Sequence, residues 1–296
     1  MLAHEYRRFI RSTYRLADPA LRAQFEQHVN EADVLIKGPY VTLARDFEVG
    51  ATLASLVAEG LGPASLARLN WSFRDAPLWS HQERAFRAVQ AGRNVVVTTG
   101  TGSGKTEAFL LPILADVLSA KASGVAGTKA ILLYPMNALA NDQLVRLREL
   151  VRGSGVPLTF ALYTGGSEET SATLGAPLDG HELTRREDIR SNPPDIILTN
   201  YKQLEFLLVR KVDRPLFTES MRALVLDELH SYRGALATEI ACLIRRLKAR
   251  CGIGRAALRC IGTSATVSQD AGGDAALARF ATLLFDARFE ARDIIS

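Results

Sequence analysis

The chain has 296 residues, of which 47% are hydrophobic and 23% are charged. This length allows one large α/β domain with a smaller appendage, and the mixed charges are typical of a globular protein. The formal net charge of +4 suits a polyanionic partner but does not identify one, because many basic proteins bind no nucleic acid.

The cysteines argue against a zinc protein, and the N-terminus argues against a protein with a signal peptide or a membrane span. Cys242, Cys251 and Cys260 form no CxxC pair, so a zinc site is not expected. We expect free, buried thiols, as in a reducing cytoplasm. Residues 1–10 are polar and basic, and no apolar run follows them. The sequence therefore predicts neither a signal peptide nor a membrane span, and it favours a cytoplasmic location.

The first 76 residues differ in pattern from the rest. Residues 2–30 are rich in Arg, and their apolar positions have the spacing of short amphipathic helices: Tyr6, Phe9, Ile10, Tyr14 and Leu16. Gly38, Pro39 and Tyr40 interrupt this pattern, and a second short helical stretch covers about 51–69. We predict that residues 1–76 form a helical N-terminal extension.

From about residue 80, strands and helices alternate. The predicted strands are 94–98, 129–134, 158–163, 195–199, 222–227 and 258–263. The predicted helices are 106–120, 138–151, 203–210, 235–250 and about 274–285. Residues 165–194 are rich in Gly, Ser, Thr, Pro and charge, and are predicted as a long, mobile surface insertion. The alternation predicts an α/β fold with a mostly parallel sheet, helices on both faces, and ligands at the carboxyl ends of the strands.

Residues 99–106, TGTGSGKT, lie between a predicted strand and a predicted helix, which is the context of a phosphate-binding loop. The glycines let backbone N–H groups point at phosphate, and the helix N-terminus adds partial positive charge. Lys105 is expected to reach the β- and γ-phosphates of ATP, and the Thr106 hydroxyl to bind Mg²⁺. Thr99 stands where the strict pattern has Gly. The predicted ATP-binding residues are Thr99, Gly100, Thr101, Gly102, Ser103, Gly104, Lys105 and Thr106.

An acidic pair follows the predicted strand 222–227. Asp227 is expected to hold Mg²⁺ as a Walker B carboxylate does. Glu228 is expected to orient and deprotonate the attacking water. His230 is a candidate for sensing the state of the nucleotide by hydrogen bonding. Lys105, Asp227 and Glu228 are thus the predicted catalytic residues.

Further stretches resemble the motifs of superfamily 2 DEAD/DEAH-box helicases, in the order that the family keeps. Residues 263–266 (TSAT) resemble motif III, 134–143 (YPMNALANDQ) motif Ia, 163–166 (YTGG) motif Ib and 198–201 (LTNY) motif Ic. Gln82 matches the Gln with which the family reads adenine. The resemblance implies a RecA-like P-loop NTPase domain over residues 77–296, in which Ser264 and Thr266 of motif III link the nucleotide site to the nucleic-acid site.

A closer resemblance is to the MrfA-like DNA helicases and to helicases of DISARM-type phage-defence systems. It rests on residues 227–247 (DELHSYRGALATEIACLIRRL), on YPMNALANDQ and on 197–210 (ILTNYKQLEFLLVR), and more weakly on Gly38, Pro39 and Tyr40. Leu229 replaces the usual Ala of the DEAH box, a conservative change. The resemblance implies ATP and Mg²⁺ as cofactors and DNA repair or phage defence as a setting.

The same resemblance places six residues along a single nucleic-acid strand. Superfamily 2 proteins hold the strand mainly by its backbone. The residues are Pro135, Asn137, Gly165, Gly166, Thr199 and Asn200. The two glycines are also compatible with an ordinary turn. Arg245, Arg246, Lys248 and Arg250 are better explained by the macrodipole at the end of a helix than by DNA binding.

The resemblance also indicates what the motor needs beyond this chain. Family members have a second RecA-like domain with motifs IV to VI and an arginine finger, and only about 30 residues follow motif III here. We expect that domain to be absent from the chain and to be supplied in cis or in trans. The isolated chain is then expected to be weakly active, because the transition state lacks an arginine opposite its charge.

Three functions remain open from the sequence. The first is the motor domain of an ATP-dependent DNA helicase or translocase that moves on single-stranded DNA. The second is a nucleotide-gated nucleic-acid-binding module, or half of a split motor, without activity of its own. The third is an RNA helicase, against which His230 and the YPMNALA form of motif Ia argue.

Overall fold

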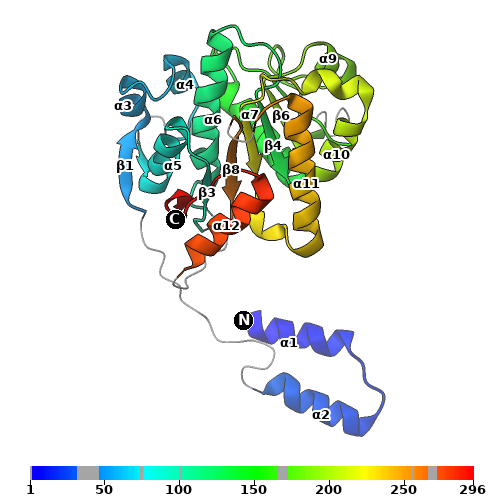
Figure 1. Ribbon diagram of the computed structural model, residues 1–296. Helices are drawn as coiled ribbons and strands as arrows, with labels where there is room; N and C mark the ends of the chain where they lie inside the picture. Colours follow the sequence, from blue (N-terminus) through cyan, green and yellow to red (C-terminus); the bar gives the residue numbers. More distant parts are fainter. Residues whose placement is uncertain are drawn as a thin grey trace. The chain divides into compact units, whose positions relative to one another are not determined.

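The computed structural model describes residues 2–31, 47–73, 76–100, 102–165, 173–254, 257–265 and 272–296. The chain divides into two compact units, residues 1–46 and 47–296 (Figure 1). The predicted break at residues 38–40 lies outside the described residues, as do three predicted site residues: Thr101, Gly166 and Thr266.

The first unit contains two helices, α1 (Leu2–Thr13) and α2 (Pro19–Asn30). Asp18 caps α2 by accepting a hydrogen bond of 2.9 Å from the Leu21 amide, and Pro19 occupies the first turn, where its missing N–H costs nothing. Arg11 of α1 donates to Glu26 at 2.9 Å and to Asn30 at 2.7 Å, both on α2. These bonds join the two helices into a hairpin.

The boundary between the units is at residue 46, and the predicted boundary at residue 76 is therefore wrong. Strand β1 (Val49–Thr52) pairs antiparallel with β2 (Pro77–Trp79), across the predicted boundary. Two short helices, α3 (Leu53–Ala58) and α4 (Ala64–Arg68), also belong to the larger unit. Leu56 and Leu66 are fully buried in the same core as Phe86, so hydrophobic burial fixes the segment there.

The larger unit is built on a seven-stranded sheet in the order β5-β6-β4-β7-β8-β3-β9, with every pair parallel. The fold class and the six predicted strands are confirmed. The strands are β3 (Val95–Val97), β4 (Ala130–Tyr134), β5 (Phe160–Leu162), β6 (Ile196–Asn200), β7 (Ala223–Leu226), β8 (Arg259–Thr263) and β9 (Ile294–Ile295). β9, at the edge beside β3, was not among the predicted strands.

Helices cover both faces of this sheet, because alternate residues of each strand point to opposite sides. One core joins Val95, Val97 and Leu132 to the helices α5, α6 and α7, and the other joins Val96, Ile131 and Leu133 to α10, α11 and α12. The helices are α5 (Ser80–Gln90), α6 (Lys105–Ala122), α7 (Asn137–Val151), α9 (Arg186–Ser191), α10 (Tyr201–Val209), α11 (Gly234–Cys251) and α12 (Gly273–Phe285), with 3₁₀ turns η1 (Lys211–Leu216), η2 (Leu229–Ser231) and η3 (Ala291–Asp293). Among the described residues, no helix has the length and apolar character needed to cross a bilayer.

The predicted surface insertion, 165–194, is anchored to the sheet over its described residues. Phe160 of β5 donates to the carbonyl of His181 at 2.8 Å and accepts from Leu183 at 3.0 Å. Arg148 and Glu182 form a buried ion pair at 2.7 Å. Residues 181–183 are therefore held against β5 through an isolated bridge between Phe160 and Glu182.

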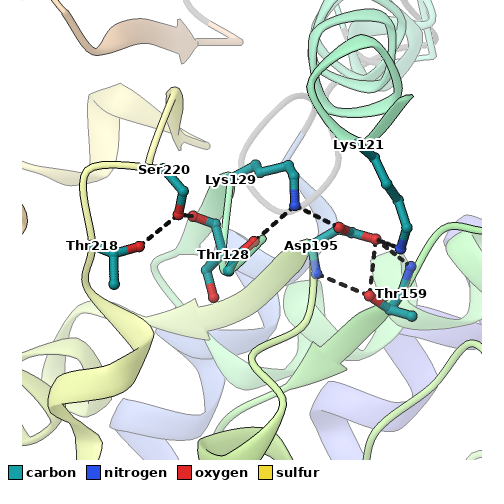
Figure 2. A network of polar contacts seen from close by, with 8 residues as sticks. Lys121, Thr128, Lys129, Thr159, Asp195, Thr218 and Ser220 are labelled. Atoms are coloured by element: carbon teal, nitrogen blue, oxygen red, sulfur yellow. Dashed lines mark hydrogen bonds and ion pairs between the residues drawn. The ribbon is translucent and has the colours of Figure 1, made fainter. Parts of the chain in front are cut away.

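The amino ends of three strands are joined by the carboxylate of Asp195, the residue before β6 (Figure 2). It accepts hydrogen bonds from Lys121 at 2.5 Å, from Lys129 at 2.8 Å and from the backbone N–H of Thr159 at 2.8 Å. Asp195 and Lys129 are almost fully buried. Burial raises the pKa of Asp195, but the bonds from Lys121, Lys129 and Thr159 outweigh it and hold that pKa below its usual value. This network lies at the amino ends of the strands, whereas the predicted site residues lie at their carboxyl ends.

The cysteines are only partly as predicted. Cys251 and Cys260 are buried, and burial raises the pKa of each thiol to about 12. Cys242, on α11, is exposed instead of buried. Its neighbours Leu243 and Ile244 take the buried face of the helix, which leaves Cys242 on the outer side.

Candidate nucleotide and nucleic-acid sites

The predicted site residues gather along the edge of the sheet that the carboxyl ends of its strands form. All seven strands are parallel, so their carboxyl ends meet there. The predicted nucleotide residues follow β3, β7 and β8, on one half of this edge. The predicted nucleic-acid residues follow β4 and β5 or form the end of β6, on the other half. The two halves meet where β4 pairs with β7.

The glycine-rich loop between β3 and α6 has the backbone that a phosphate-binding loop needs. Gly102 and Gly104 have φ of 77° and 75°, in the left-handed region that glycine adopts without steric cost. Lys105 donates to the carbonyl oxygens of Thr99 at 2.9 Å and Gly100 at 3.3 Å, across the loop. Ser103 donates to the Thr99 hydroxyl at 2.6 Å. The Thr in place of Gly therefore contributes a bond that stabilises the loop.

Helix α5 supports this loop from the side through two consecutive side chains. His81 Nε2 lies 2.9 Å from the carbonyl oxygen of Ser103, and Gln82 Nε2 donates to the carbonyl of Gly104 at 3.1 Å. Gln82 Oε1 accepts from the backbone N–H of Trp79 at 2.9 Å. Gln82 is thus buried with both ends of its amide bonded to protein, so the structure places it against the loop, where it holds the loop's shape. His81 was not predicted, although it stands beside Gln82 in the same motif.

The acidic pair follows β7, which is separated from β3 by β8. The Asp227 amide donates to Leu133 at 3.0 Å, which fixes the end of β7 against β4. Glu228 has φ of 57°, a left-handed conformation that strains residues other than glycine. Burial raises the pKa of Asp227, the hydrogen bond from Thr263 opposes this, and the charge of Glu228 adds to it. The turn therefore brings two carboxylates together in a partly buried position.

Thr263, at the end of β8, bonds to both acidic residues and was not among the predicted site residues. Its hydroxyl donates to the Asp227 carboxylate and accepts from the backbone N–H of Glu228 at 3.1 Å. The only signal in the sequence was its place as the first residue of TSAT. The next residue, Ser264, donates its backbone N–H to Val97 at 2.9 Å, directly before the glycine-rich loop. Motif III is thus joined to both parts of the nucleotide site.

His230, in η2, lies beside the predicted general base. Its Nδ1 is 3.1 Å from Oε2 of Glu228, although the two atoms lack the alignment of a hydrogen bond. Its backbone carbonyl accepts from Arg233 at 2.8 Å. His230 is thus in contact with the predicted general base, and its role in sensing the nucleotide stays a prediction.

On the other half of the edge, two predicted residues touch each other. Asn200 Nδ2 donates to Asn137 Oδ1 at 2.5 Å, and Asn200 Oδ1 caps α10 by accepting from Gln203 at 2.8 Å. Asn137 begins α7 and is exposed, and Pro135 is half-buried just before it. Two helix N-termini, of α7 and α10, therefore lie side by side at this edge, which favours an anion.

Two other predicted residues on this half differ in exposure. Gly165 is exposed, and a side chain there would meet nothing within 4 Å. Thr199 is fully buried, and its hydroxyl donates to the carbonyl of Tyr163 at 2.6 Å. The Thr199 hydroxyl therefore joins the ends of β5 and β6. The residue has no exposed surface that could contact a strand of nucleic acid.

The basic cluster on α11 has partners in the protein, at the C-termini of two neighbouring helices rather than of α11, whose own macrodipole was the predicted explanation. Lys248 donates to the carbonyls of Phe285 and Asp286 at 2.8 Å, and Arg245 donates to Leu283 at 3.0 Å, all at the end of α12. Arg250 donates to Leu208 at 2.6 Å, at the end of α10. These cations offset carbonyl dipoles at the C-termini of two neighbouring helices.

A family model of the DEAD/DEAH box helicases matches residues 79–272. This range includes the glycine-rich loop, the acidic pair and the TSAT segment. It also includes the predicted nucleic-acid residues.

Two curated relatives show the same resemblance. Druantia protein DruE of Escherichia coli is 27% identical over 92% of this chain and 20% of its own length. The uncharacterized ATP-dependent helicase YprA of Bacillus subtilis is 32% identical over 64% of this chain and 23% of its own length. The chain thus spans about a fifth of the length of these relatives.

Solved structures agree with the fold. The DUF1998 helicase MrfA bound to DNA superposes with a TM-score of 0.64 at 26% identity, over 85% of this chain and 29% of that protein. The DEAD-box helicase Mss116 bound to single-stranded RNA superposes with a TM-score of 0.62 at 17% identity, over 82% of this chain and 45% of that protein. The predicted resemblance to MrfA-like helicases is confirmed, and so is the RecA-like fold.

Proposed function

Since this chain belongs to the DEAD/DEAH box helicase family, we propose that it is the ATP-binding motor domain of an ATP-dependent DNA helicase or translocase. One observation carries the proposal: a single sheet edge holds the glycine-rich loop and acidic pair on one half and the Asn137–Asn200 pair on the other. Nucleotide and nucleic acid would then bind a few strands apart on one rigid support.

In this proposal, the glycine-rich loop binds the phosphates of ATP. Lys105 would leave the carbonyls of Thr99 and Gly100 and turn its ammonium group to the β- and γ-phosphates. The backbone N–H groups of the loop and the N-terminus of α6 would face the same phosphates. Helix α5 would keep the loop in place through His81 and Gln82.

The residues present also fit Mg²⁺. The Thr106 hydroxyl and the Asp227 carboxylate are the hard oxygen ligands that this ion prefers. Oε2 of Glu228 is buried and makes no hydrogen bond to the described residues, so the site has an oxygen to offer to a bound water. When bound, Mg²⁺ would neutralise charge on the phosphate oxygens. Thr263 would orient Asp227, and Glu228 would take the proton from the attacking water.

The proposal includes a second RecA-like domain, in cis or in trans. An arginine finger from such a domain would stabilise the transition state, and its absence would leave this chain weakly active by itself. The chain matches only about a fifth of its first relatives, which supports a larger functional assembly.

We propose single-stranded DNA as the track, with RNA as the alternative. MrfA, which superposes at 26% identity, has been solved bound to DNA, whereas Mss116, solved bound to RNA, is only 17% identical. The Asn137–Asn200 pair and the adjacent helix N-termini suit a phosphate backbone of either kind. A role in DNA repair or in phage defence is part of the same proposal.

The test is ATP hydrolysis by this chain with oligo(dT), with oligo(U) and without nucleic acid. Stimulation by DNA above that by RNA supports the proposal. Stimulation by RNA alone would instead assign the chain to the RNA helicases. ATP binding without hydrolysis in any of the three mixtures would favour half of a split motor.

A further inference from the structure

A single arginine connects the described part of the 165–194 segment to the turn after β5. Arg186 is the first residue of α9. Its Nη2 donates to the carbonyl oxygen of Gly165 at 2.8 Å and to that of Thr164 at 3.4 Å. These two carbonyls belong to the turn that carries the predicted strand-binding Gly165. The guanidinium group therefore lies directly at this turn.

An aromatic ring packs against this guanidinium group and fixes its position. Cζ of Arg186 lies 5.8 Å from the centroid of the Tyr163 ring, within the range of a cation–π contact. The Tyr163 hydroxyl donates to Asp213 at 3.1 Å, and Arg190 donates to the same carboxylate oxygen at 2.6 Å. Tyr163 and Asp213 are fully buried. The ion pair between Arg190 and the buried Asp213 thus holds the ring, and the ring and two carbonyls hold Arg186.

The remaining donors of Arg186 are available. Within the part of the chain that the structure describes, its Nε and Nη1 groups make no hydrogen bond. The residue is half-buried, and Gly165 beside it is exposed with open space above it. A planar guanidinium with free N–H groups, already held in one orientation, loses little entropy when it binds a phosphate oxygen.

We propose that Arg186 binds a backbone phosphate of the nucleic acid that crosses the Thr164–Gly165 turn, while its Nη2 keeps the turn in shape. This inference rests on the proposed function. It extends the phosphate-binding edge from the Asn137–Asn200 pair, at β4 and β6, to the outer strand β5. It also adds a cation that binds nucleic acid to a site whose other predicted nucleic-acid residues are neutral.

The experiment measures binding of fluorescent oligo(dT) by anisotropy at several salt concentrations, with Mg²⁺ and a non-hydrolysable ATP analogue. In Arg186→Gln, the slope of log affinity against log salt should fall by about 0.7, the loss of one phosphate contact on a single strand. Arg186→Lys keeps the charge and should keep the slope, with weaker binding because lysine cannot hold two carbonyls and a phosphate together. Analogue binding should stay as in the wild type, because Arg186 lies outside the nucleotide half of the site.

Arg185→Gln is the matched control, since it removes the same charge one residue away. The Arg185 side chain is 67% exposed and lies 3.4 Å from Glu187, away from the turn. Its slope should equal that of the wild type. An unchanged slope in Arg186→Gln, or an equal loss in Arg185→Gln, would overturn the role of Arg186 alone. Failure of the wild type to bind oligo(dT) at any salt concentration would overturn the proposed function together with it.

Discussion

Leu229 fills the space that the missing side chain of Gly262 leaves on β8. A Cβ atom at residue 262 would lie only 3.0 Å from Cγ of Leu229 and would overlap one of its methyl groups. Leu229 is the residue that replaces the usual Ala of the DEAH box, and it is almost fully buried. The pair packs the turn of the acidic residues against β8. The Leu in the box is thus matched by a glycine on the neighbouring strand.

This relationship predicts coupling between two substitutions. Gly262→Ala should lower the free energy of unfolding by about 1–3 kcal/mol, because it overpacks a buried contact. Leu229→Ala alone should lower it by about 2–5 kcal/mol, because it leaves a cavity, and the double variant should lose less than the sum of the two, because the new methyl group fills part of that cavity. Chemical denaturation of the two single variants and the double variant measures the coupling. Strictly additive losses would show that the two side chains do not compete for one space.

Glu228→Gln should keep ATP binding but reduce hydrolysis. The amide cannot accept the proton of the attacking water, and a general base typically contributes about 10²- to 10⁴-fold in rate. Glu205→Gln, at an exposed position of α10, removes the same charge away from the site and is the control. Turnover should be compared at saturating ATP with single-stranded DNA present. Equal rates in Glu228→Gln and the wild type would exclude Glu228 as the base.

Asn200→Ala should have two effects, and Asn137→Ala only one. Asn200 caps α10, so its loss should cost about 1 kcal/mol of stability as well as affinity for single-stranded DNA. Asn137 is exposed and, among the residues that the structure describes, its side chain bonds only to Asn200, so its loss should lower affinity with little change in stability. Thermal unfolding and DNA titration separate the two effects. Equal affinity for DNA in all three proteins would remove the pair from the proposed track.

Asp195→Asn should destabilise the fold by roughly 3–5 kcal/mol near neutral pH, because it leaves the buried ammonium of Lys129 without its counter-charge. The pKa of Asp195 is lowered in the folded chain, so its contribution is present above the unfolded pKa of about 3.9 and is lost as pH falls through the folded pKa. The difference between variant and wild type should therefore shrink below about pH 4.

Denaturant unfolding at several pH values checks this prediction. Asp179→Asn, at an exposed carboxylate, is the control and should behave as the wild type at every pH. A difference that persists unchanged into acid would show that packing, and not the charge of Asp195, stabilises this corner of the sheet.

Much of the fold could be predicted because its signals are local. The six predicted strands are short buried runs between glycine-rich or charged segments, and each has a clear pattern of its own. β9 was missed because Ile294–Ile295 is too short to show any period, and only its pairing with β3 makes it a strand. The boundary at residue 76 was wrong for a similar reason. The helical pattern of 51–69 does not reveal that Leu56 and Leu66 pack into the core of the larger unit.

The site shows the same division between local and long-range information. The spacing of TGTGSGKT was sufficient to place Lys105 and Thr106 at the start of α6. The contact between Gln82 and Gly104 spans 22 residues, and the bond between Thr263 and Asp227 spans 36. No local pattern predicts such pairs. Thr199 was predicted on the surface by its motif, although its place in a strand buried on both faces favours an interior position.

The most direct test of an ATP-driven motor domain is a calorimetric titration of Mg-ATP into this chain and into Lys105→Ala. The wild type should bind, and the variant should lose about 10- to 150-fold in affinity, since a hydrogen bond to a charged group is worth roughly 1.5–3 kcal/mol. Lys211→Ala, at an exposed lysine of η1, should bind as the wild type does. Equal affinity in Lys105→Ala and the wild type, or no binding by either, would contradict the assignment of this sheet edge to ATP.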